Sequence, residues 1–158
     1  MEQNCVQILE RSLEKKNQTL SKIIEQNNLQ ETILKQEEFD MEAFEASIDV
    51  QNQLIEELEQ LDTGFEALYD RVRDDMMKNK EKYHQEIASM KDLIQQITAK
   101  VVTVNAGNMR NKSLAENQFK KARANIRNGV SKSKVARGYY NNMNNLNYVS
   151  PQFYDNKK

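Results

Sequence analysis

The first part of the chain repeats apolar residues at alternating intervals of three and four positions, which places them on one face of a helix. This stripe runs between about Gln3 and Gln36 through Val6, Leu9, Leu13, Leu20, Ile23 and Leu34. The same register also places Lys16, Asn27 and Gln30 on the stripe. A tight two-stranded coiled coil tolerates few polar residues at its seam, so the pattern favours a helix in a looser bundle.

A second helix is predicted after Asp40, because a short carboxylate there can accept hydrogen bonds from the free amides of the first turn. Two lines of apolar residues then run side by side. They are Phe44, Ile48, Ile55, Leu58, Phe65, Tyr69, Val72 and Met76, and Leu54, Leu61 and Leu68. So wide an apolar face suits a helix that packs on two neighbours, and it also suits a groove for a partner's helix.

The third helix has the most regular pattern. The apolar spacing pauses around Lys78 to Lys80, which predicts a turn that reverses the chain. It then resumes through Tyr83, Ile87, Met90, Ile94, Ile97, Val101 and Val104. The stripe becomes polar at Asn105, Asn108 and Asn111. We expect the helix to continue there but to leave the main core as a basic arm, on which a weaker apolar face has no evident partner within the chain.

These patterns predict an all-α protein, an elongated antiparallel bundle of about three long helices in which Leu58, Phe65, Ile94 and Ile97 are buried together. No proline precedes Pro151, so little interrupts the helices. We expect residues 1–128 to form the bundle, with the basic helical extension beginning near 105. Residues 129–158 are expected to form a flexible basic and aromatic tail, partly disordered.

The tail contains five of the eleven aromatic residues of the chain, namely Tyr139, Tyr140, Tyr148, Phe153 and Tyr154. Too few aliphatic residues accompany them to build a core. Two interpretations follow: a disordered end, or a short linear motif whose aromatic side chains anchor to another protein.

The net charge of -1 conceals a strong asymmetry along the chain. Residues 1–109 contain 12 Lys and Arg against 22 Asp and Glu, while residues 110–158 contain 11 against 2. The two parts therefore carry charges of -10 and +9. Either the tail folds back on the acidic body, or each part meets a partner of opposite sign.

Residues that would support catalysis or metal binding are scarce. His84 is the only histidine and Cys5 the only cysteine. Glu81 and His84 have the Glu-x-x-His spacing of di-iron bundles, but those sites need two such motifs. Neither a phosphate-binding glycine loop nor a zinc-ligand pattern occurs. We expect no enzyme activity, no catalytic residues, no metal and no cofactor.

The chain also has no apolar run long enough for a bilayer and no signal-peptide start, so we expect a cytoplasmic protein without membrane insertion. The basic arm raises polyanion or nucleic-acid binding as one alternative function. The acidic body would repel a polyanion, so we do not expect nucleic acid as a partner. A structural coiled-coil protein that self-associates is the other alternative.

Three stretches carry a resemblance to a known family. They are the run Leu54 to Glu66, the pair Asn105 and Asn108, and an ending with Tyr139-Tyr140-Asn141-Asn142-Met143, Tyr148-Val149, Phe153 and Asp155-Asn156-Lys157-Lys158. With its helices placed in this order, the whole chain resembles the FlgN-type flagellar secretion chaperones, which are small helical proteins of similar length. Gly107, between the two asparagines, departs from this likeness, because a helix former is expected at this position of the third helix.

The resemblance implies a cytoplasmic chaperone that binds the C-terminal helices of hook-filament junction (hook-associated) proteins. Such a chaperone prevents their premature assembly and delivers them to the cytoplasmic domain of the export gate. By position and character, the candidate client-binding residues are Ala115, Phe119, Ala122, Ile126 and Val130. Tyr139 and Tyr140 are the candidates for contact with the export gate.

Overall fold

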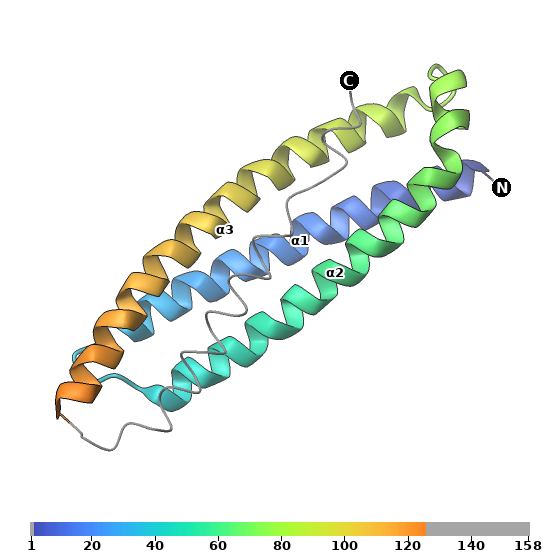
Figure 1. Cartoon of the computed structure of the whole chain (residues 1–158). Helices are drawn as coiled ribbons and strands as arrows, with labels where there is room; N and C mark the ends of the chain where they lie inside the picture. Colours follow the sequence, from blue (N-terminus) through green and yellow to red (C-terminus); the bar gives the residue numbers. More distant parts are fainter. Residues whose placement is uncertain (1, 126–158) are drawn as a thin grey trace.

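The computed structural model describes residues 2–125, and this part of the chain is an all-α antiparallel bundle without strands. Its three helices are α1 (Glu2–Lys35), α2 (Met41–Lys78) and α3 (His84–Asn125). They have 34, 38 and 42 residues, so they are about 50–65 Å long. They run up, down and up along one long axis (Figure 1), which confirms the predicted fold class.

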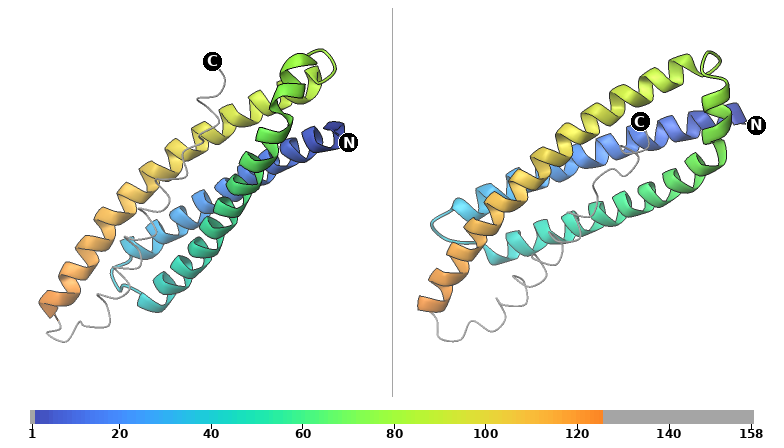
Figure 2. Two further views of the ribbon diagram at one scale, coloured as in Figure 1. Left: turned by 45° about the vertical axis from the view of Figure 1, so that its right-hand side comes forward. Right: turned by 45° about the horizontal axis from the view of Figure 1, so that its top comes forward.

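Helix α1 lies between the other two helices and forms the two extensive interfaces of the bundle, one with α3 and one with α2. The three views of the ribbon agree on this arrangement (Figures 1 and 2). Because α1 is buried from two sides, its polar stripe residues must find partners inside the bundle.

Local hydrogen bonds mark both ends of α2. The Oδ1 of Asp40 accepts from the backbone N–H of Ala43 at 3.1 Å, which confirms the predicted N-cap of α2. At the other end of α2, the backbone N–H of Asn79 donates to the carbonyl of Asp75 at 3.0 Å. The chain then turns through residues 79–83, where the pause in the apolar pattern predicted a reversal.

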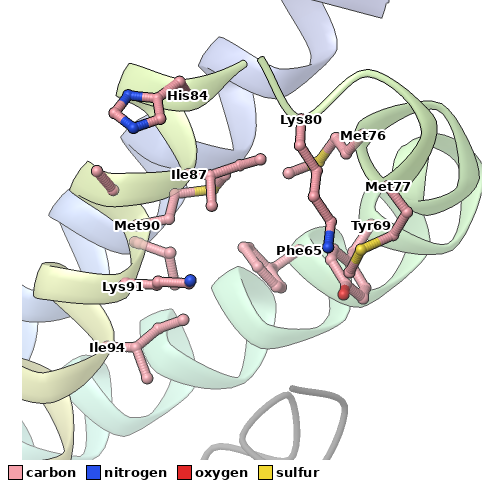
Figure 3. A pocket seen from close by; sticks show the side chains of 12 residues that line it. Phe65, Tyr69, Met76, Met77, Lys80, His84, Ile87, Met90, Lys91 and Ile94 are labelled. Atoms are coloured by element: carbon pink, nitrogen blue, oxygen red, sulfur yellow. The ribbon is translucent and has the colours of Figure 1, made fainter. Parts of the chain in front are cut away.

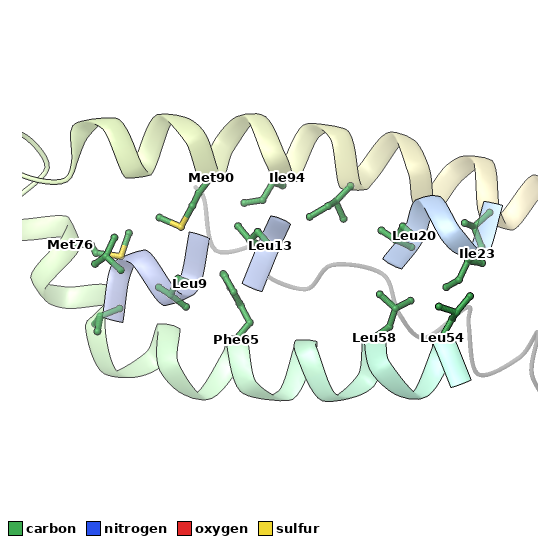
Figure 4. Packing of buried hydrophobic residues seen from close by; sticks show 14 of the residues in the cluster. Leu9, Leu13, Leu20, Ile23, Leu54, Leu58, Phe65, Met76, Met90 and Ile94 are labelled. Atoms are coloured by element: carbon green, nitrogen blue, oxygen red, sulfur yellow. The ribbon is translucent and has the colours of Figure 1, made fainter. Parts of the chain in front are cut away.

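The larger core occupies the half of the bundle next to this turn (Figure 4). The predicted set Leu58, Phe65, Ile94 and Ile97 is buried in it, which confirms that expectation. All three helices contribute. The other buried members are Val6, Leu9, Leu13, Leu20, Ile23, Leu54, Ile55, Val72, Met76, Tyr83, Met90 and Val104.

A second, smaller core lies at the opposite end. Its buried members are Ile33, Leu34, Phe44, Ile48, Ala115 and Phe119. The ring centroid of Phe119 lies 6.1 Å from that of Phe39 and 6.2 Å from that of Phe44, so three aromatic rings meet there. The expectation that the late part of the third helix leaves the core without an intrachain partner is therefore wrong.

A layer of buried amide side chains separates the two cores, and we call it the amide layer: Asn27, Gln30, Gln51, Asn108 and Asn111. The Nε2 of Gln30 donates to Oε1 of Gln51 at 2.8 Å, and the Nε2 of Gln51 donates to Oδ1 of Asn27 at 3.1 Å. The Nδ2 of Asn27 donates to Oδ1 of Asn108 at 3.2 Å, while the Nδ2 of Asn111 donates to the Asn27 carbonyl at 2.8 Å. The layer thus links all three helices.

Helix α3 passes through Gly107 without a break, which confirms that the third helix continues beyond its change to polar stripe residues. Gly107 is buried against α1. A Cβ atom there would lie 2.9 Å from Nδ2 and 3.3 Å from Cβ of Asn27. The glycine therefore permits a close approach of the two helices and does not end the third.

Candidate functional site

A pocket of about 430 Å³ opens between α2 and α3 near the turn that joins them, with Leu13 of α1 among its lining residues (Figure 3). Its volume is in the usual range for ligand and side-chain binding sites. The other lining residues are Phe65, Tyr69, Met76, Met77, Lys80, His84, Ile87, Ala88, Met90, Lys91 and Ile94.

The walls of the pocket are apolar and include three methionines. Phe65 and Tyr69 stack one turn apart on α2, with ring centroids 5.8 Å apart and an interplanar angle of 11°. Met76 and Met90 are buried, whereas the side chain of Met77 is 50% exposed. Thioether side chains adapt to irregular shapes, so this wall suits a partner whose surface varies.

Two lysines stand at the pocket from opposite sides. Lys80 extends from the turn toward Tyr69, and Lys91 points across from α3 (Figure 3). Both side chains are exposed, and within residues 2–125 neither forms an ion pair. These ammonium groups give the pocket a positive edge on a body whose overall charge is negative.

The turn beside the pocket is held by Asp75. Its carboxylate accepts from Nδ2 of Asn79 at 2.8 Å and from the Tyr83 hydroxyl at 2.9 Å. The hydrogen bond to Asp75, followed by desolvation, raises the pKa of Tyr83 above its ordinary value because both favour the neutral phenol. Tyr83 is itself buried in the larger core, so the turn is tied to the bundle.

An ion pair joins α1 to α2 about one helical turn from the lining residues Leu13 and Phe65. The Nζ of Lys16 donates to Oδ1 of Asp62 at 2.5 Å, and the Lys16 side chain is almost fully buried. Desolvation raises the pKa of Asp62 above its ordinary value, although the Lys16 charge opposes this shift. The polar stripe residue Lys16 thus has a partner on the neighbouring helix.

The client-binding residues suggested by the sequence do not form an open surface. Ala115 and Phe119 are buried in the smaller core, and Ala122 is half-buried. Ile126 and Val130 lie outside the described residues, as do the export-gate candidates Tyr139 and Tyr140. The premise that Ala115 and Phe119 lack intrachain partners is wrong, while a client-binding role for this end of the chain stays a prediction.

The asparagine pair of the family resemblance occupies two different environments. Asn108 belongs to the amide layer, where its Oδ1 accepts from Asn27. Asn105 is half-buried, and its buried Oδ1 has no hydrogen-bond partner among the described residues. The structural role of Asn108 is therefore to bind α3 to α1.

The described residues bring together no group of three His, Cys, Asp or Glu side chains that could hold a metal ion. His84 is exposed at the outer edge of the pocket, and Cys5 is a half-buried free thiol packed against the larger core.

Sequence reasoning did not identify the pocket, because its existence depends on how far α2 and α3 diverge over α1. One signal was present. Met76, Met77 and Met90 flank the predicted turn, and methionines are over-represented at adaptable binding surfaces.

No helix within residues 2–125 combines the length and hydropathy that a membrane crossing requires. Comparison of the chain with protein-family models, with curated proteins and with solved structures finds no match.

Proposed function

We propose that this protein is a cytoplasmic export chaperone of the flagellar type that binds the C-terminal helices of hook-filament junction proteins. It keeps these helices from assembling prematurely and delivers them to the export gate. The binding is reversible and involves no catalysis.

The observation that carries the proposal is the apolar pocket between α2 and α3. A subunit that polymerises through amphipathic helices needs those helices covered before export, and a groove lined by large apolar side chains provides such cover. Phe65, Tyr69 and the three methionines form that lining. The resemblance of the Leu54 to Glu66 run and of the aromatic ending to FlgN-type chaperones supports the choice of client.

The test is titration calorimetry of the full chain with a purified hook-filament junction protein. The same junction protein shortened at its C-terminus serves as the control. We expect the intact client to bind and the shortened client not to bind. Equal binding of both forms would refute the assignment of the C-terminal helices as the bound segment.

Two further measurements separate this proposal from its alternatives. Binding to mixed-sequence DNA that weakens steeply with salt, without affinity for any junction protein, would favour a polyanion-binding protein. Concentration-dependent self-association without client binding would favour a structural coiled-coil protein. Sedimentation at several protein concentrations measures this self-association.

A further inference from the structure

From the chemistry of the pocket, we infer that it binds an amphipathic helical segment with acidic flanks, whose bulky apolar side chains enter between α2 and α3 while its carboxylates pair with Lys80 and Lys91. The inference rests on the proposed function for the identity of the natural client. It adds the binding site on this chain and the class of sequence that the site selects.

The size of the pocket sets the number of anchors. A cavity of ~150 Å³ accommodates one benzene ring, so a pocket of about 430 Å³ has room for roughly two or three apolar side chains. Its lining spans Phe65 to Met77 on α2 and His84 to Ile94 on α3. At the helical rise per residue these spans are about 15–18 Å, or about three turns. Anchors at positions i, i+3 or i+4, and i+7 of a client helix fit that length.

The charges select among possible occupants. Lys80 and Lys91 flank an apolar surface and form no ion pair within the described part of the chain, so an incoming carboxylate can pair with either without displacing another. A basic segment would place like charges beside both lysines. Residues 110–158 of this chain carry a charge of +9, which makes them a poorer match for the pocket than an acidic helix.

The first variant fills the pocket without removing a core contact. Ala88 lines the pocket and is exposed, so Ala88→Phe places a ring in the space that the client's anchors need. Ala99 is also exposed on the same helix but is not part of the lining, so Ala99→Phe is the matched control. We expect Ala88→Phe to weaken client binding by about tenfold or more, as for one lost hot-spot contact, and Ala99→Phe to leave it unchanged.

The second variant tests the charges. Lys91→Glu should weaken binding about three- to tenfold at low salt, and the loss should shrink as salt screens the edge of the pocket. Lys22 is exposed on α1 and is not part of the lining, so Lys22→Glu makes the same change in net charge elsewhere. Changing one acidic residue of the client to lysine should restore its binding to the Lys91→Glu variant.

A pair of labelled synthetic helices gives a readout that does not depend on the natural client. Both have leucines at i, i+4 and i+7; one has glutamates at its flanks and the other has lysines. Fluorescence anisotropy should show that the wild-type chain binds the acidic helix more tightly, and that Ala88→Phe abolishes this preference.

The outcomes distinguish the two proposals. If a junction protein binds but neither Ala88→Phe nor Lys91→Glu affects it, the proposed function stands and this inference is overturned. If no junction protein binds but the acidic helix does so through the pocket, the inference stands and the proposed client is wrong. If the chain binds neither, both are overturned.

Discussion

Replacing Gly107 by alanine tests how closely α1 and α3 approach. In an exposed helix interior, alanine is more favourable than glycine by about 1 kcal/mol. At Gly107 the added Cβ would lie 2.9 Å from Nδ2 of Asn27, which is closer than such atoms pack, so the Asn27 amide must move. We expect this displacement to outweigh the gain in helix propensity.

The hydrogen bonds of Asn27 set the size of the effect. Its side chain donates to the carbonyl of Val104 at 3.3 Å and to Asn108 at 3.2 Å, and accepts from Gln51 at 3.1 Å. Its backbone carbonyl accepts from Asn111, so α1 cannot easily move away. Loss of two side-chain hydrogen bonds costs about 2–4 kcal/mol, because the partners left behind are buried. After subtraction of the gain in helix propensity, the Gly107→Ala variant should be less stable than the wild type by about 1–3 kcal/mol.

Gly64 provides the matched control, since a Cβ there meets no atom within 4 Å. Gly64→Ala should stabilise the protein by about 0.5–1 kcal/mol. Urea unfolding followed by circular dichroism measures both variants. In Asn27→Ala, where the obstructing amide is gone, Gly107→Ala should lose most of its cost. If Gly107→Ala is as stabilising as Gly64→Ala in the wild-type background, the close approach of α1 and α3 is refuted.

Three further predictions follow from buried contacts. Phe119→Ala should lower the free energy of unfolding by about 3–5 kcal/mol, which urea titration measures; a neutral result would contradict its burial in the smaller core. Burial raises the pKa of Asp62 above its ordinary value of 3.8, so the folded state holds this proton more tightly than the unfolded chain does. The stability of wild type relative to Asp62→Asn should therefore fall as pH rises from about 4, and the opposite slope would mean that the attraction of Lys16 dominates. Tyr83→Phe should lower the stability near neutral pH by removing the hydrogen bond to Asp75. The difference should shrink above pH 10, where the unfolded phenol ionises, and thermal scans at both pH values check this.

The start of α2, the turn after it and the buried faces of the helices could be predicted from the spacing and type of residues along the sequence. Asp40 predicted the start of α2 through the hydrogen-bonding capacity of its carboxylate, and that bond is present. The apolar spacing predicted the turn before Tyr83 and the burial of Leu58 and Ile97. These features depend on residues within a few turns of one another, so the sequence contains them directly.

Contacts between distant residues were not predictable in the same way. Asn27 and Gln30 are polar residues on the apolar stripe of the first helix. Nothing near them in sequence indicates that their partners are Gln51 and Asn108. Phe119 seemed unpartnered because its neighbours, such as Phe44, belong to another helix. The pocket likewise depends on the divergence of two helices over a third, which apolar spacing along one helix does not describe.

The amide layer also determines how the helices are aligned along their length. A bundle of leucine-rich stripes has several alignments of similar energy, because a shift by one heptad brings leucines opposite other leucines. In this chain such a shift would place Asn27 and Gln51 against hydrocarbon, and each stranded amide would cost about 1–3 kcal/mol. The native alignment is the one in which every helix brings its amides to the same level. The layer therefore selects a single alignment of the three helices along their axes. The pocket and its two lysines depend on that alignment for their relative positions.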